Sequence, residues 1–271
     1  QDRRGAAGVD QGGKLLLLQQ VLSPRSLTGK AASLVAEVPF DRFGKGPDYF
    51  KAGTAVGFTT TLAKDGKHML IGLTPAGTVR SAGCPVVAVM VDGKMEPKWI
   101  NTLATDPGAV RVDIFGVQVD KAGAAWYLVK NVTDAAPKTK DAVGYGFTLY
   151  RLDSAGQQAF PLDLGKEDFV QDAGFEILPG GAIACGGVYS DHDASQDESI
   201  GVFTTSLDPA SGKWTKASLA PCDKQTVTKV ERLQTHMHLE HIRPRSDGSI
   251  IVVDERSGEE SHMVSDLSGK K

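Results

Sequence analysis

The densest group of metal-ligand side chains lies near the C-terminus, where His236, His238 and His241 occur together with Glu240. On a strand, His236 and His238 point to one face, and two imidazoles at this spacing can share a zinc ion. The competing interpretation is a polar, solvent-facing strand that leads into a hairpin, because no further ligand stands at motif spacing. We therefore keep His236 and His238 as zinc candidates.

A second group of possible ligands is the acidic stretch from Asp191 to Glu198. Its alternating side-chain oxygens resemble those of a calcium loop, but Gln196 replaces the glycine that an EF-hand needs, and the glutamate at the twelfth position is missing. A solvated loop between two strands is the alternative. We keep Asp191, Asp193 and Asp197 as calcium candidates and expect no other cofactor.

The patterns of nucleophilic catalysis and phosphate binding are missing from the chain. It contains no G-x-S-x-G elbow. The run Gly12–Lys14 precedes a strand-like segment and not a helix, so it is not a phosphate loop. Carboxylates that are sequence neighbours, such as Glu167 and Asp168, face opposite ways on a strand. No catalytic residue can be assigned, and the sequence favours a protein that is not an enzyme.

The charge and the apolar runs of the sequence argue against nucleic acid as a partner and against a membrane-spanning helix. With 30 basic and 33 acidic residues the formal net charge is −3, which gives no positive field for nucleic acid. The longest aliphatic run, Leu15–Leu18, is far shorter than the roughly 20 residues of a membrane span. The three cysteines leave two possibilities open, one disulfide with one free thiol or three buried thiols; they are Cys84, Cys185 and Cys222.

The elements that must position these residues are short strands, and they repeat. An alternating strand, a turn with glycine and an apolar strand occur four times, and the turn glycines recur at intervals of 57 to 67 residues; they are Gly66, Gly123, Gly181 and Gly248. A second turn with aspartate and glycine follows in the first three periods, at Asp92, Asp153 and Asp208. Aspartate caps such turns and glycine supplies a positive φ. Two hairpins per period predict a four-stranded antiparallel meander.

Because one meander cannot bury its faces alone, the repeat predicts an all-β, propeller-like array of about four blades in one domain, 1–271. A β-sandwich with similar hairpins is the alternative. Helical patterns are sparse: the segment from Gly165 to Gly174 has room for one short turn of helix, and no longer segment has a helical period. The predicted units are 50–107, 108–166, 167–222, and a closing or partial blade from 14–40 and 233–267. We expect one of two arrangements: the two terminal segments pair into one closing blade, or the natural chain continues past Lys271.

Several segments resemble a known group of proteins. The hairpin in Phe58–Gly72 is similar to those of TolB-like and WD40-like propellers. The stretches Phe175–Trp214 and His238–Glu255 look like a group of exported, propeller-like proteins of Bacteroidota. The resemblance implies an architecture and an envelope or extracellular location, and it carries over no catalytic residue. The start at Gln1, without an initiator methionine, is typical of a mature exported chain or of a trimmed one.

These observations predict a non-catalytic binding or scaffold module of the cell envelope or extracellular space, periplasmic or associated with the outer membrane. We expect a protein or glycan partner on the rim loops Thr133–Val143 and Asp191–Ser199, and no transmembrane segment. The main alternative is a secreted polysaccharide hydrolase or lyase with carboxylates at the propeller channel. A further alternative is a subunit of an export or surface-filament assembly.

Overall fold

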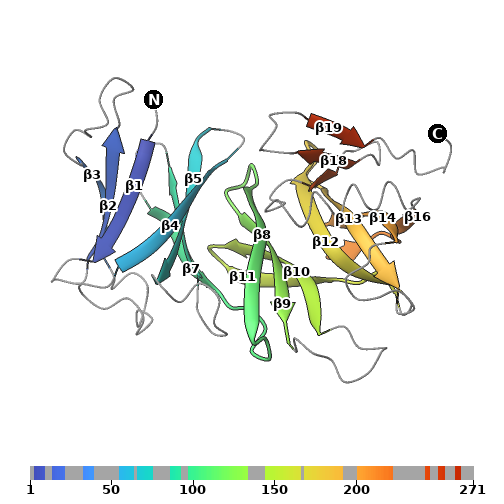
Figure 1. Ribbon diagram of the computed structural model, residues 1–271. Helices are drawn as coiled ribbons and strands as arrows, with labels where there is room; N and C mark the ends of the chain where they lie inside the picture. The colour runs from blue at the N-terminus through green and yellow to red at the C-terminus, as the bar shows by residue number, and fades with distance from the viewer. Residues whose placement is uncertain are drawn as a thin grey trace. The chain divides into compact units, whose positions relative to one another are not determined.

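The described parts of the chain consist of strands and the turns that join them (Figure 1). The structure is a computed structural model, and it describes residues 3–9, 14–21, 33–39, 55–63, 66–75, 86–92, 97–133, 144–165, 168–191, 200–221, 242–244, 250–253 and 260–263. Within these residues no helix is long and apolar enough to cross a membrane.

The first sheet has seven strands in the order β3-β2-β1-β4-β5-β6-β7. Its neighbours pair antiparallel, and β1 joins β4 through the pairs Ala7↔Val56 and Gly8↔Ala55. The strands are β1 (Arg3–Val9), β2 (Lys14–Val21), β3 (Ser33–Pro39), β4 (Ala55–Leu62), β5 (His68–Pro75), β6 (Val86–Asp92) and β7 (Pro97–Leu103).

Two further sheets follow the chain order. The second has the order β11-β10-β9-β8 and comprises β8 (Arg111–Val119), β9 (Ala125–Val132), β10 (Tyr145–Asp153) and β11 (Gly156–Leu162). The third has the order β12-β13-β14-β15, and β16 also pairs with β14. Its strands are β12 (Asp168–Ile177), β13 (Ile183–Asp191), β14 (Gly201–Asp208), β15 (Lys213–Trp214) and β16 (Ser218–Pro221).

A fourth sheet of three strands lies in the C-terminal segment and consists of β17 (Ile242–Pro244), β18 (Ile250–Val253) and β19 (Glu260–Met263). In the described residues, the strands of 14–40 and those of 233–267 belong to different sheets. The joint closing blade and the single domain stay predictions. The predicted helical turn after Gly165 is wrong, because β12 already begins at Asp168 and pairs with β13 from Asp168 to Ile177, with one register shift.

The hairpin turns have the predicted chemistry. In the turn after β8, Asp120 Oδ1 accepts hydrogen bonds from the backbone N–H groups of Ala122 and Ala124, both at 2.9 Å. Gly123 then adopts a φ of 79°, which a residue with a Cβ rarely tolerates. Five predicted turn glycines lie in described parts of the chain and all have positive φ, namely Gly66, Gly123, Gly156, Gly181 and Gly212. The prediction for these turns is confirmed.

The central strands are buried on both faces. Every residue of β6 except the last is buried, and the same holds for β13. In β9 only Lys130 departs from this pattern. An antiparallel sheet by itself leaves its faces in water. Strands that are buried on both faces therefore need other parts of the chain packed against each face, as in a propeller blade. The predicted all-β, propeller-like fold of antiparallel sheets is confirmed, and the second sheet has the predicted four strands.

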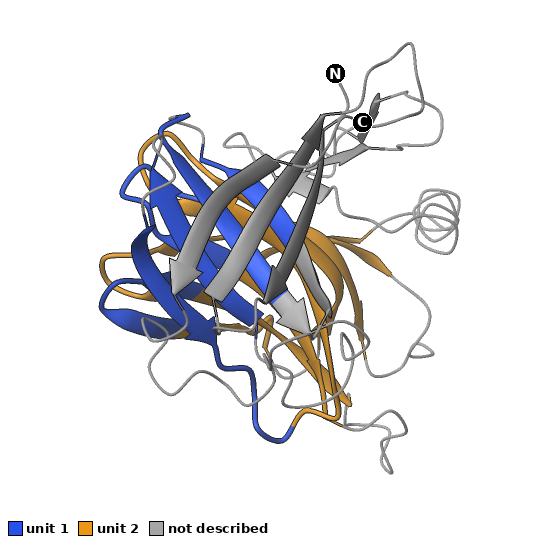
Figure 2. Ribbon diagram, turned by 90° about the vertical axis from the view of Figure 1, so that its left-hand side faces the viewer, with its two compact units in different colours: residues 1–108, 119–126, 151–158 blue, residues 109–118, 127–150, 159–271 orange. Residues whose placement is uncertain are grey.

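The chain divides into two compact units (Figure 2). The first comprises residues 1–108, 119–126 and 151–158, and the second comprises 109–118, 127–150 and 159–271. In the first unit, Leu70, Ile71 and Leu103 are almost completely buried, together with Trp126. In the second, the core includes side chains of β9, β10, β13 and β14, namely Leu128, Leu149, Ile183, Phe203 and Leu207.

Candidate functional site

A charged and aromatic cluster in the second unit lies near the strand ends that flank one of the predicted rim loops. Lys130 is near the end of β9 and Tyr145 begins β10, on either side of residues 134–143. The Thr133 N–H donates a 2.8 Å hydrogen bond to the Gly144 carbonyl, which closes the base of this connection. We name this group the Lys130 cluster; it consists of Arg111, Asp113, Phe115, Lys130, Tyr145, Phe147, Phe169 and Asp172.

Two aromatic rings lie beside the Lys130 ammonium group, and two more rings pack against them. Its Nζ lies 3.7 Å from the centroid of the Tyr145 ring and 5.5 Å from that of Phe147. The rings contact one another edge to face, with centroids 6.4 Å apart for Tyr145 and Phe169 and 5.1 Å apart for Phe115 and Phe147. Phe147 is buried, whereas Tyr145, Phe169 and Phe115 are half-buried. Partly exposed rings beside a cation are suited to contact a ligand.

A β-bulge brings β12 into the cluster. The register with β13 shifts between Val170 and Asp172, so Gln171 is an extra residue on β12. On a regular strand, side chains three residues apart point to opposite faces of the sheet. One extra bulge residue between them brings both side chains to the same face. Phe169 and Asp172 therefore both contribute to the same cluster.

The bulge is packed closely against β13. A Cβ on Gly187 would lie 1.9 Å from the Asp172 carbonyl oxygen, so this position admits only glycine without a backbone shift. The Ala173 N–H donates a 2.8 Å hydrogen bond to Asp172 Oδ1 and thereby orients the carboxyl group. Asp172 is thus positioned by its own strand and by the neighbouring one.

The charges of the cluster are only partly balanced. Burial raises the pKa of Asp172 to about 7, against the opposing effects of the Ala173 hydrogen bond and the Lys130 charge. Burial also lowers the pKa of Lys130, which the Asp172 charge opposes and the nearby Arg111 charge reinforces. Arg111 itself forms a 2.9 Å ion pair with Asp113. A carboxyl group that titrates near neutral pH beside a desolvated amine is typical of functional sites.

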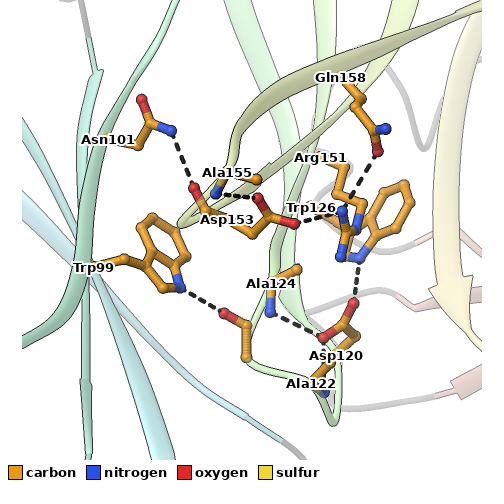
Figure 3. Close-up of polar contacts among 11 residues, drawn as sticks. Trp99, Asn101, Asp120, Ala122, Ala124, Trp126, Arg151, Asp153, Ala155 and Gln158 are labelled. Atoms are coloured by element: carbon orange, nitrogen blue, oxygen red, sulfur yellow. Dashed lines mark hydrogen bonds and ion pairs between the residues drawn. The ribbon is translucent and has the colours of Figure 1, made fainter.

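A second cation over an aromatic ring, in the first unit, has a different environment (Figure 3). The Arg151 guanidinium lies 5.8 Å from the Trp126 ring, forms an ion pair with Asp153 and donates a 3.4 Å hydrogen bond to Gln158. Trp126 Nε1 donates a 3.0 Å hydrogen bond to Asp120 Oδ2. Because nearby protein groups satisfy these polar atoms, we assign this group a structural role.

The metal candidates are only partly covered by the structure. Asp191 ends β13 and pairs in register with Asp168, whereas Asp193, Asp197, His236 and His238 lie outside the described residues. Among the residues that are described, no three His, Cys, Asp or Glu side chains are grouped closely enough to hold a metal ion. The calcium and zinc sites stay predictions. Cys185 is a free, buried thiol whose pKa burial raises to about 12, and Cys84 and Cys222 are outside the described ranges.

Our interpretation of the sequence missed the Lys130 cluster. One signal was present, because Lys130 is the single charged residue in the otherwise buried strand from Trp126 to Val132. Asp172 gave no comparable signal, since its segment was expected to form a helical turn. Arg111 and Asp113 lie near Lys130 because β8 and β9 are neighbours in one sheet, whereas Asp172 comes from β12 of another sheet. A single sequence shows neither arrangement.

Comparison with known proteins gives no family assignment. No protein-family model matches the chain, and no curated protein matches it. Similar solved structures include a protein of unknown function from Dyadobacter fermentans, with 10% identity and a TM-score of 0.39. That alignment covers 80% of this chain and 69% of the other.

Two similar structures are enzymes. A variant of apocarotenoid oxygenase from Synechocystis has 16% identity and a TM-score of 0.40, over 94% of this chain and 58% of that one. The α-L-arabinanase of Penicillium chrysogenum, in complex with arabinobiose, has 13% identity and a TM-score of 0.37, over 81% and 59%. The chain thus spans less than two thirds of either enzyme. At this level of likeness neither activity transfers to the chain.

Proposed function

We propose that the chain is a non-catalytic binding module that takes its partner at the Lys130 cluster. The observation that carries this proposal is a half-buried ammonium group among half-exposed rings, with only partial charge compensation. Desolvating a charge that the protein does not fully pair costs free energy, and groups perturbed in this way are enriched at functional sites.

The position of the cluster supports the same proposal. Tyr145 follows the predicted rim loop 133–143, and Phe169 pairs with Ser190, next to Asp191, where the second predicted rim loop begins. The 6.4 Å contact between the Tyr145 and Phe169 rings therefore joins the bases of both loops. Loops on a rigid sheet are common locations for binding residues.

We further propose an exported location, in the cell envelope or outside the cell, as for the Bacteroidota group that the chain resembles. The turn and strand motifs of Phe58–Gly72 and Phe175–Trp214 support this assignment. The neutral-to-acidic charge balance agrees with a protein or glycan partner.

The test is a binding panel with the variant Lys130→Met. Immobilised polysaccharides (xylan, amylose, alginate and polygalacturonate) and an envelope protein extract are probed with the purified chain. We expect Lys130→Met to weaken binding at least about tenfold, the equivalent of one lost charge contact. The matched control is Lys98→Met, which removes an exposed lysine paired with Asp92 at 2.7 Å and leaves the Lys130 cluster intact. Equal binding by both variants and the parent chain contradicts the proposal.

One observation favours a second candidate function, a secreted polysaccharide hydrolase. Asp172 has a pKa of about 7, so that about half of the molecules at neutral pH carry a proton there, which a general acid could donate to a leaving oxygen. The same panel reports this function through newly released reducing ends. Turnover that disappears in Asp172→Asn establishes the hydrolase and replaces the binding proposal.

A further inference from the structure

The electrostatics of the Lys130 cluster indicate the charge of its ligand, on the basis of the binding function proposed above. Two cations, Lys130 from β9 and Arg111 from β8, are close enough for Arg111 to lower the pKa of Lys130. Two carboxyl groups, those of Asp113 and Asp172, face these cations, and Asp113 already forms a 2.9 Å ion pair with Arg111. Within the described part of the chain, Lys130 forms no ion pair, and Asp172 acts on it only over a longer range.

A ligand anion would stabilise this arrangement. It would compensate Lys130 and relieve the repulsion between Lys130 and Arg111, whereas a ligand cation would add to that repulsion. The half-exposed rings of Tyr145, Phe169 and Phe115 add an apolar surface beside the charge. A uronic acid unit carries a carboxylate next to the apolar C–H face of a rigid ring, and so it matches both features.

We propose that the Lys130 cluster is a binding site for an acidic polysaccharide, with the ligand carboxylate on Lys130 and the sugar ring against the aromatic side chains.

The cluster makes this binding depend on pH. Within the described residues, the charged and titratable groups that face Lys130 are Arg111 and Asp113 on β8, Tyr145 on β10 and Asp172 on β12. Asp172 is largely neutral below its pKa of about 7, so that Lys130 is free to pair with the ligand. Above that pH the Asp172 carboxylate competes with the ligand carboxylate for Lys130 and repels it. The affinity therefore falls as pH rises from 6 to 8.

The experiment measures binding of an oligogalacturonate and of its methyl ester, which is the neutral counterpart, at pH 6 and pH 8. We expect the unmodified chain to bind the acid about tenfold more tightly at pH 6 than at pH 8, the effect of about one unit-charge contact. We expect Asp172→Asn to retain at pH 8 the affinity it has at pH 6, and Lys130→Met to lose the acid at both pH values. Near-UV circular dichroism verifies that both variants are folded.

Each other result overturns the inference in a recognisable way. If the methyl ester binds as tightly as the acid and Lys130→Met abolishes both, the site is a glycan site without charge selection, and the proposed function stands. If the acid binds but Lys130→Met does not weaken it, the site is elsewhere and both proposals fail. If the folded chain binds neither the oligogalacturonate nor an alginate oligomer at pH 6, the acidic-polysaccharide assignment is wrong.

Discussion

Among the residues that the structure describes, two cationic side chains lie over aromatic rings, and their different surroundings separate a structural group from a candidate site. Arg151 has an aspartate partner, a glutamine partner and the Trp126 ring within its own unit. Lys130 has the rings but forms no ion pair in the described residues, and its burial lowers its pKa against the opposing charge of Asp172. A cation–π pair alone does not indicate function, so the proposed site rests on the incomplete charge compensation of Lys130.

At the scale of a single residue, we predict that Asp172→Asn stabilises the protein only at higher pH. The folded-state pKa of Asp172 is raised from 3.8 to about 7, so its contribution to stability is complete below the unfolded value and is lost as pH rises through about 7. The asparagine of the Asp172→Asn variant does not ionise, so the variant does not lose this stability at high pH. Its unfolding free energy should exceed that of the parent by about 1–2 kcal/mol at pH 8, a value discounted for partial exposure, and the gain should be smallest near pH 4.

The matched control for that prediction is Asp208→Asn. The Ser211 hydroxyl and backbone N–H groups lower the pKa of Asp208, so its contribution is present above the unfolded value and is lost only as pH falls through the lower folded value. Urea titrations should show a constant effect of this variant between pH 5 and pH 8. A gain for Asp172→Asn that does not change over the same range would contradict the assigned titration.

At the scale of the elements, two glutamine side chains form hydrogen bonds with backbone groups that lie at or next to a sheet edge. Gln118 lies on edge strand β8, and both of its backbone partners lie on edge strand β12. Its Nε2 donates a 2.7 Å hydrogen bond to the Phe175 carbonyl, and its Oε1 accepts one of 3.1 Å from the Ile177 N–H. Gln157 on β11 makes the same pair of bonds with Ala104, at 2.7 and 2.8 Å. Each carboxamide satisfies a backbone donor and a backbone acceptor at or next to a sheet edge.

We predict that Gln118→Ala destabilises the protein by about 1–3 kcal/mol and Gln157→Ala by about 0.5–1 kcal/mol. The bonds of Gln118 are partly buried, so its loss leaves backbone groups of β12 that water replaces poorly, whereas water readily replaces the exposed Gln157. The two midpoints of urea unfolding provide the comparison. An effect of Gln157→Ala that equals or exceeds that of Gln118→Ala would contradict the prediction that partial burial strengthens the contact with β12.

The sequence predicts these elements well where the determining residues are local. Asp120 and Gly123 lie within one turn, and their spacing alone predicts the hairpin. The bulge at Gln171 depends on the register with β13, and the contact from Gln118 depends on a strand of another sheet. Lys130 could have been noticed as a charge in an apolar strand, but its partners come from strands that are distant in the sequence. The site is therefore less predictable than the fold.

At the scale of the whole molecule, the burial of the central strands determines what can fold independently. The side chains of β9 are buried on both faces, apart from Lys130. The predicted repeat unit 108–166 contains only one sheet, whose two faces would both be exposed in isolation. Single sheets of this size are at best marginally stable in water without a packing partner.

We therefore predict that fragment 108–166 alone shows no cooperative thermal transition and no near-UV circular dichroism, whereas fragment 50–222, with three predicted units, shows both. The physical reason is that Leu128 and Leu149, which are completely buried in the full chain, would lose much of their cover in the short fragment. Circular dichroism of the two purified fragments at matched concentration provides the measurement. A sharp transition of the short fragment would mean that each sheet has a sufficient core of its own, and the repeat would then be a string of small domains that do not depend on their neighbours for stability.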